Sequence, residues 1–170
     1  MTLLTNVIRG AAADRLLLLA HGYGADERDL GALVPYLDPE GRFAVVLPRG
    51  PVSVPGTPGF AWYDFGGAPD PAGFAAAMDA LDEVVDEQCE ALGLDRANAI
   101  FGGFSQGGGL ALALGLRSAA AGTGPAGVLA MSPFFPLAPP GPGAPAIPVL
   151  VQHGTHDPLI PAQKSRDLAR

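Results

Sequence analysis

The chain has 170 residues, which suits one domain with a sizeable core, because a chain of this length buries about 70% of its unfolded surface on folding. Its formal net charge is −7 and its ten lysines and arginines are scattered, so no basic track is available for phosphates and we expect no nucleic-acid partner. Hydrophobic residues make up 48% of the chain, which argues against disorder, and the single cysteine excludes an internal disulfide.

The first strongly apolar segment, residues 16–20, is too short to cross a membrane. The charged residues Asp14 and Arg15 directly precede it, where a signal peptide would be uncharged. We therefore expect a cytoplasmic protein with no membrane span.

The N-terminal part of the chain predicts two strands and a helix. Residues 5–8 suit a weak strand, and residues 15–20 form a nearly unbroken apolar run of strand length. A strand that is apolar on both faces is typical of a parallel sheet with helices on each side. A glycine-rich loop at residues 21–26 follows, and then a helix near residues 27–37, in which leucines recur at helical spacing.

The middle of the chain predicts a strand, a long irregular connection and a long helix. The strand covers residues 42–47, and a connection rich in proline and glycine leads from it to the aromatic segment 61–65. Asp70 is a suitable N-cap for the helix, Pro71 fits its first turn, and Gly93 ends it. Between them apolar residues repeat every three or four positions.

The remaining residues continue the alternation of strands and helices. Three further apolar runs predict strands, at residues 98–101, 127–131 and 148–152. Helices are predicted after the first of these strands and again from about Pro161. The pattern predicts an α/β fold with a mostly parallel sheet and helices on both faces, and residues 1–170 as one domain.

The candidate nucleophile is Ser105, which lies in the sequence Gly103-Phe104-Ser105-Gln106-Gly107 between a predicted strand and a predicted helix. A G-x-S-x-G sequence at such a junction is typical of a sharp turn that holds the serine hydroxyl clear of the sheet at its carboxyl end. We expect both flanking glycines to be required, because a Cβ there would collide with the neighbouring strand or helix.

Asp157 is the candidate acid. A serine hydroxyl needs a base to take its proton, and the base needs an acid to hold it in the right tautomer. Asp157 follows a late predicted strand, so it is expected at the same sheet edge as Ser105, and serine before acid is the chain order of α/β-hydrolases. The alternative, that Asp157 merely begins a turn with Pro158, stays open.

Two backbone N–H groups are candidates for an oxyanion hole. One belongs to Gln106, the residue after the nucleophile, and the other to Tyr23 in the glycine-rich loop. His21, in the same loop, is expected to be a packed or hydrogen-bonded residue and to take no direct part in catalysis.

Several blocks, in order along nearly the whole chain, resemble the phospholipase/carboxylesterase family of α/β-hydrolases, close to bacterial carboxylesterases and acyl-protein thioesterases. The blocks are His21-Gly22, Ala61-Trp62-Tyr63-Asp64, Gly103 to Gly108, Gly127 to Ser132 and His153 to Pro161. The resemblance implies Ser105 as nucleophile, Asp157 as triad acid, Tyr23 and Gln106 as oxyanion donors, and Trp62 near the substrate. A purely structural packing role for Trp62 is equally open.

One departure from the family pattern concerns the triad histidine. In the family it follows the acid, on a loop after one further strand, whereas here no histidine follows His156. We therefore expect a C-terminally truncated form that lacks the last strand and helix of the fold. His156 is a poor substitute, because it is adjacent to Asp157 and consecutive residues of an extended loop point in different directions. A metal site at His153, His156 and Asp157 is not expected, since no fourth ligand accompanies them, and neither is a cofactor.

The resulting hypothesis is a serine carboxylic-ester hydrolase that forms an acyl-enzyme with short or medium acyl esters or thioesters. Phe134, Phe135 and Leu137 either line an acyl pocket or simply pack in the core. The competing hypothesis is a catalytically inactive α/β-hydrolase-like protein that binds a ligand or a partner in the same cleft. In either case the strand before Asp157 is expected at an open sheet edge, through which copies of the chain can associate.

Overall fold

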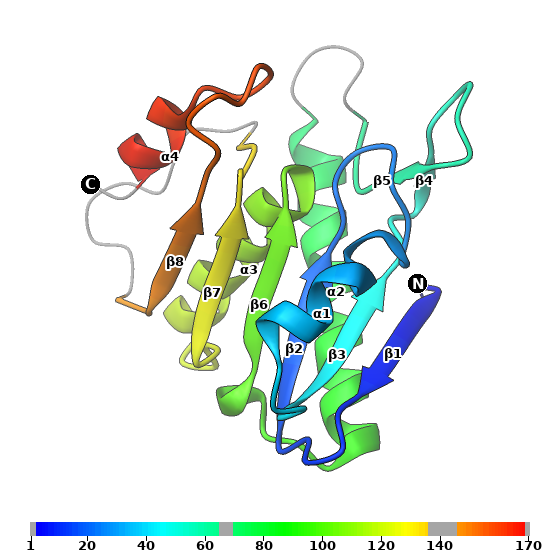
Figure 1. Ribbon diagram of the computed structural model, residues 1–170, viewed down its shortest axis with the longest axis vertical. Helices are drawn as coiled ribbons and strands as arrows, with labels where there is room; N and C mark the ends of the chain where they lie inside the picture. Colours follow the sequence, from blue (N-terminus) through cyan, green and yellow to red (C-terminus); the bar gives the residue numbers. More distant parts are fainter. Residues whose placement is uncertain (1–2, 65–69, 136–145, 169–170) are drawn as a thin grey trace.

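The computed structural model describes residues 3–64, 70–135 and 146–168. A six-stranded sheet forms its centre, with the strand order β1-β3-β2-β6-β7-β8 (Figure 1). The strands are β1 Thr5–Arg9, β2 Arg15–Ala20, β3 Phe43–Pro48, β6 Ile100–Phe104, β7 Gly127–Met131 and β8 Val149–Gln152. Among these strands only β1 runs antiparallel to its neighbour, so the sheet is mostly parallel. A separate short hairpin consists of β4 Val52–Ser53 and β5 Phe60–Ala61.

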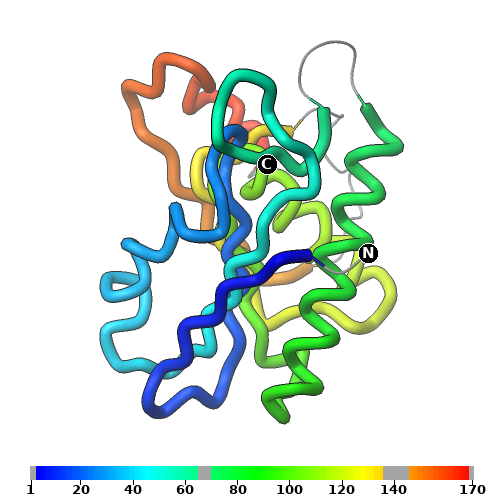
Figure 2. The backbone as a smooth tube through the Cα atoms, turned by 90° about the vertical axis from the view of Figure 1, so that its right-hand side faces the viewer, coloured from blue at the N-terminus to red at the C-terminus, as the bar shows by residue number. Residues whose placement is uncertain are grey.

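Helical segments lie on both faces of this sheet (Figure 2). On one side are α2 Pro71–Leu92 and α3 Gln106–Ala120, and on the other are the 3-10 turn η1 Asp29–Leu33 and α1 Val34–Leu37. The remaining helical segments are η2 Arg96–Asn98 and α4 Ala162–Leu168. None of the helices in the described part of the chain is both long enough and apolar enough to cross a membrane.

The apolar run of β2 is explained by the two layers. Leu16 and Leu18 belong to the buried cluster under α2 and α3, whereas Leu17 and Leu19 belong to the cluster under η1 and α1. Alternate side chains of a strand point to opposite faces, so a strand that is covered on both sides has to be apolar throughout. The predicted fold class, an α/β fold with a mostly parallel sheet and helices on both faces, is thereby confirmed.

The caps of α2 also follow from the sequence. The Asp70 side chain accepts a hydrogen bond of 2.8 Å from the Gly73 N–H, and Gly93 ends the helix with a φ of 65°. The helix predicted near residues 27–37 is present over residues 29–37, but only its last four residues are α-helical, since the first five form a 3-10 turn. Gly31 has a low helix propensity and Pro35 cannot donate a backbone hydrogen bond, so a continuous α-helix is disfavoured there.

The carboxyl ends of β2, β6, β7 and β8 meet at one edge of the sheet, and the loops after these strands carry the candidate site residues (Figure 1). In the register, Phe104 at the end of β6 pairs with Met131 of β7, and Met131 pairs with Gln152 of β8. Residues that follow these three positions are therefore neighbours in space.

Candidate active site

Ser105 occupies a strained turn between β6 and α3. Its φ is 52°, a backbone conformation that residues other than glycine rarely adopt. Three backbone hydrogen bonds hold it: the Ser105 N–H donates to the Met131 carbonyl at 2.9 Å, and the Ser105 carbonyl accepts from Gly109 at 3.0 Å and Phe134 at 2.9 Å. The turn is thus fixed by β7, by the first turn of α3 and by the loop that follows β7.

The glycines around Ser105 are required by close backbone contacts. A Cβ on Gly103 would lie 2.4 Å from the Gly107 carbonyl oxygen, and a Cβ on Gly107 would lie 2.1 Å from the Ala20 carbonyl oxygen. Real Cβ atoms do not approach so closely, so the expectation that only glycine fits on either side of the serine is confirmed.

The two candidate oxyanion donors lie on different segments, Tyr23 in the loop after β2 and Gln106 at the start of α3. A Cβ built on Gly22 would lie only 3.6 Å from the Ser105 Cβ, so the loop after β2 passes directly beside the serine. Tyr23 is the next residue of that loop, with 45% of its surface exposed. Gln106 is the first residue of α3, and the first N–H groups of a helix have no partner within the helix. Their position at the positive end of the helix dipole suits a developing negative charge.

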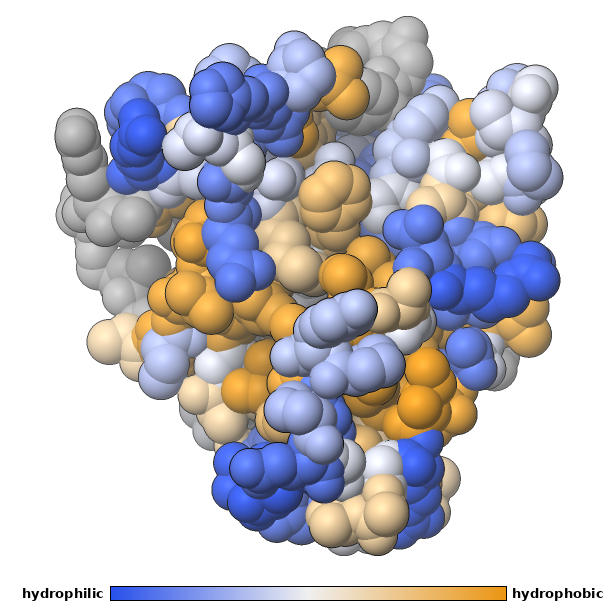
Figure 3. Space-filling model, viewed as in Figure 1, coloured by the Kyte–Doolittle hydropathy of each residue, from blue (hydrophilic) through white to orange (hydrophobic). Residues whose placement is uncertain are grey.

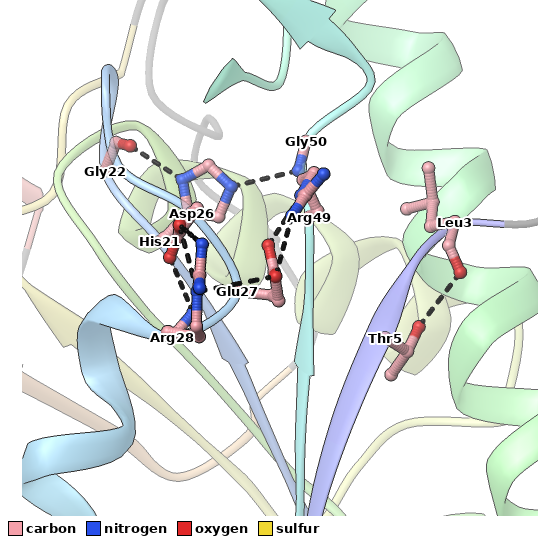
Figure 4. A network of polar contacts seen from close by, with 9 residues as sticks. All are labelled: Leu3, Thr5, His21, Gly22, Asp26, Glu27, Arg28, Arg49 and Gly50. Atoms are coloured by element: carbon pink, nitrogen blue, oxygen red, sulfur yellow. Dashed lines mark hydrogen bonds and ion pairs between the residues drawn. The ribbon is translucent and has the colours of Figure 1, made fainter. Parts of the chain in front are cut away.

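The loop after β2 is fastened by His21 and by a nearby ion pair (Figure 4). The buried His21 ring accepts a hydrogen bond at Nε2 from the Gly50 N–H at 2.9 Å, so its Nδ1 carries the hydrogen and donates to the Gly22 carbonyl at 2.7 Å. Glu27 accepts two hydrogen bonds from the Arg49 guanidinium, at 2.5 and 2.7 Å. Both interactions tie the loop to the segment that follows β3.

Burial lowers the pKa of His21 below its ordinary value of about 6.5, since burial disfavours the charged ring. His21 is therefore neutral near pH 7 and packed, and the expectation that it takes no direct catalytic part agrees with two occupied ring nitrogens.

This lowered pKa predicts an acid-sensitive contribution to stability. A group whose pKa is depressed on folding contributes stability above its unfolded pKa, and that stability is lost as the pH falls below it. We expect the parent chain to lose more stability between pH 7 and pH 5 than a His21→Gln variant, which has no titrating ring. The pH dependence of urea unfolding measures this difference. An unchanged slope in His21→Gln would contradict the prediction.

Trp62 is buried beneath the loop after β2, with 1% of its surface exposed. Its indole N–H donates to the His21 carbonyl at 2.8 Å, and the two rings lie 5.0 Å apart. The indole is thus placed in the core next to the candidate site and not on an open wall of it. The side chain of Gln106 is equally buried, and its amide bonds to the backbone of residues 62 and 63.

Asp157 lies in the loop after β8, at the same sheet edge as Ser105 and two strands away from it. Its Oδ1 accepts hydrogen bonds from the N–H groups of Leu159 and Ile160, each at 2.9 Å. These bonds, that of Ile160 first, lower the pKa of the Asp157 carboxyl, so the group is ionised at neutral pH. Asp157 thus begins a turn, which is the alternative role that the sequence left open. Its other carboxylate oxygen, Oδ2, lies 3.3 Å from Nε2 of His153.

The two C-terminal histidines are placed differently from one another. The His153 side chain is buried, and it contacts the Ser165 hydroxyl at 2.6 Å and the Ile160 carbonyl at 2.7 Å, one with each ring nitrogen. His156 is exposed, and its Nδ1 contacts the Thr155 hydroxyl at 3.2 Å. Within residues 3–64, 70–135 and 146–168, no group of three histidine, cysteine or acidic side chains is placed to hold a metal ion.

A hollow of about 270 Å³ opens beside the serine turn. It is lined by Pro133, Phe134, Phe135, Ile160, Lys164, Asp167 and Leu168. Phe134 connects it to the serine, because the Phe134 N–H is bonded to the Ser105 carbonyl. Leu137, which was grouped with the two phenylalanines, lies outside the described residues.

Known proteins are similar to this one over nearly the whole chain. The chain is 28% identical over 168 residues to a Bacillus subtilis (strain 168) protein named as the hydrolase MhqD, covering 97% of this chain and 80% of the relative. Among solved structures it is similar to esterase PE8, with a TM-score of 0.82 and 29% identity over 98% of this chain and 81% of the other. It is also similar to the Bacillus cereus carboxylesterase, with a TM-score of 0.78 and 26% identity over 98% and 77% of the two chains.

The model of one protein family, described as Phospholipase/Carboxylesterase, matches residues 6–170. This match covers nearly the entire chain. The chain therefore has an α/β-hydrolase fold and belongs to the phospholipase/carboxylesterase family.

Proposed function

We propose that this chain is a serine carboxylic-ester hydrolase that forms an acyl-enzyme at Ser105. The observation that carries the proposal is the strained Ser105 backbone, with a φ of 52°, at the start of α3 and beside Gly22. Such a conformation costs about 1–3 kcal/mol and persists only where the surrounding structure imposes it, which is typical of functional sites. Ser132 also has a positive φ, of 42°, but Ser105 combines the strain with the first turn of a long helix and with the close approach of Gly22.

In the proposed reaction the Ser105 Oγ attacks the carbonyl carbon of the ester and loses its proton to a base. The N–H groups of Gln106 and Tyr23 stabilise the negative charge that develops on the carbonyl oxygen. The alcohol or thiol then leaves with a proton, and water hydrolyses the acyl-enzyme to release the acid and restore the hydroxyl. The hollow beside Phe134 supports short or medium acyl chains as substrates, because its walls are largely apolar.

In a catalytic triad an acid orients a histidine base, and we propose Asp157 for the position of that acid. Its ionised carboxylate suits that role. Among the described hydrogen bonds none joins a histidine ring to Ser105, and both ring nitrogens of His21 and of His153 have other partners. We therefore propose that a base from solution takes the Ser105 proton in this chain.

Trapping of the acyl-enzyme tests the proposal directly. Trypsin cleavage after Arg96 and after Arg117 yields a peptide, residues 97–117, in which Ser105 is the single serine. After brief exposure to p-nitrophenyl butyrate and an acid quench, we expect this peptide to carry one butyryl group, as measured by mass spectrometry. Ser105→Ala should remove the adduct. If the parent binds the ester but no adduct forms on this peptide, the chain is a binding protein and the hydrolase proposal is wrong.

We also propose that copies of the chain associate through β8. This strand contains no charged residue, and among the described strands none pairs with its outer edge. Leu150 is 57% exposed and Val149 is 40% exposed, and Figure 3 shows apolar surface extending from this edge across the neighbouring face. A second copy offers the same unpaired backbone groups, so two edges can pair about a two-fold axis.

The association is expected to be sensitive to charge at the edge. Leu150→Lys should shift the chain from dimer toward monomer, because two lysines would face each other across the paired strands and lose hydration. Sedimentation velocity over a range of protein concentrations measures the shift. Leu4→Lys, the same change at an equally exposed leucine beside β1 at the opposite end of the strand order, is the matched control. A parent chain that stays monomeric at the highest concentration would exclude the association.

A further inference from the structure

The two proposed oxyanion donors belong to different parts of the chain. Tyr23 lies in the loop after β2, whereas Gln106 begins α3 after β6. An oxyanion hole works only if both N–H groups lie about 2.7–3.1 Å from the position of the developing charge. Some contact therefore has to fix the distance between the loop after β2 and the start of α3.

The side chain of Gln106 makes such a contact with a third segment. It is 1% exposed, and both polar atoms of its amide are used. Its Oε1 accepts a hydrogen bond from the backbone N–H of Trp62 at 2.9 Å, and its Nε2 donates to the backbone carbonyl of Tyr63 at 3.1 Å. The amide therefore bonds the backbone after β5 as a neighbouring strand would, and joins that backbone to the first residue of α3.

Trp62 extends this connection to the loop after β2. Its indole N–H donates to the His21 carbonyl at 2.8 Å, and its ring lies 5.0 Å from the imidazole. Gly22, the next residue, lies beside the Ser105 side chain. A continuous set of buried hydrogen bonds thus leads from Gln106 through Trp62 to the loop that carries Tyr23.

We infer that the side-chain amide of Gln106 is a positioning group, which acts through Trp62 to hold the two oxyanion donors at a fixed spacing. The inference rests on the proposed hydrolase function. It adds a role for the side chain of Gln106, whereas the proposed function uses only the backbone N–H of this residue. An amide is needed at this position because one bond requires an acceptor and the other requires a donor. A methionine has the same reach and provides neither.

Amide hydrogen exchange tests the connection without any need for turnover. In Gln106→Met we expect exchange of the backbone amides of residues 21–27 to become about ten-fold faster, because their link to α3 is broken. Exchange in the middle of α2 should stay at the parent rate. Gln88→Met, the same change in α2 and away from the site, is the matched control. Unchanged exchange at residues 21–27 would overturn the inference.

If Gln106→Met loosens the whole chain, so that α2 also exchanges faster, Trp62→Phe takes its place. This change removes one hydrogen bond, that of the indole N–H to the His21 carbonyl, and keeps a large aromatic ring. Faster exchange confined to residues 21–27 supports the inference, and parent-like exchange there refutes it.

Kinetics test the positioning role itself. For Ser105-dependent ester hydrolysis we expect Gln106→Met to lower kcat by about ten-fold while KM changes by less than about two-fold, because a misplaced donor weakens transition-state binding only. Gln106→Glu provides a conservative rescue, since a protonated carboxyl both donates and accepts. Its kcat relative to that of the parent should rise as the pH falls, and a constant ratio would count against positioning. Absence of Ser105-dependent turnover in the parent would instead refute the proposed function, and the exchange result would still decide the connection.

Discussion

Imidazole in solution is expected to accelerate acylation of Ser105 by about 10²-fold, the lower end of the range for a general base, since a free base is not held in position. The reason is that the ring nitrogens of His21 and His153 already have partners, so neither is placed to deprotonate the serine. An added base can reach the serine turn, because an open hollow of about 630 Å³ lies at the carboxyl ends of β6, β7 and β8. The rate at which the 97–117 peptide gains a butyryl group, measured at increasing imidazole concentration, gives the effect.

Ser105→Ala is the control for this experiment, because imidazole also hydrolyses activated esters without any protein. In the variant the 97–117 peptide should gain no butyryl group at any imidazole concentration, and the imidazole-dependent release of p-nitrophenol should equal that of the protein-free reaction. Ser132→Ala removes the other serine at this sheet edge, which also has a positive φ, of 42°, and should keep the acceleration. Equal acceleration in the parent and in Ser105→Ala would mean that Ser105 is not the acylated residue.

Gly107→Ala is expected to lower the free energy of unfolding by about 4 kcal/mol or to prevent folding. The new Cβ would lie 2.1 Å from the Ala20 carbonyl oxygen and 2.5 Å from the His21 carbonyl oxygen. Both are backbone atoms at the end of β2, the central strand, so no side-chain rotation relieves the overlap. Ordinary overpacking costs about 1–3 kcal/mol, and a clash with fixed backbone exceeds it.

Urea unfolding followed by circular dichroism measures this loss. Gly31→Ala is the matched control, because its Cβ would have one neighbour, the Ile8 side chain, at an ordinary 3.8 Å. Its effect should stay within about 1 kcal/mol, the range of an unstrained change from glycine to alanine in a helical turn. A loss below about 1 kcal/mol in Gly107→Ala would show that α3 can move away from β2, contrary to the packing around the serine turn.

The site contains interactions that sequence reasoning did not find. The Gln106 amide and Trp62 are separated by 44 positions, and no pattern in the sequence joins them. The one hint was a polar residue at the start of a helix whose next ten residues are apolar or glycine. Gln106 was singled out for its backbone N–H alone. The roles of Ser105, Asp157, Tyr23, Trp62 and Phe134 in catalysis or substrate binding stay predictions.

The features of this protein that the sequence by itself determined are those that depend on interactions between residues close together in the chain. The six strands of the main sheet, the caps of α2 at Asp70 and Gly93 and the glycines around Ser105 depend on side chains and backbone angles within a few residues, so they are visible in the sequence. The short hairpin of β4 and β5 was not predicted, since this segment was expected to be irregular. Only the tertiary structure decided that Trp62 is buried, since that depends on segments distant in the sequence. Packing also decided the short turns at residues 29–37, because a segment of weak helix propensity takes the form that its neighbours allow.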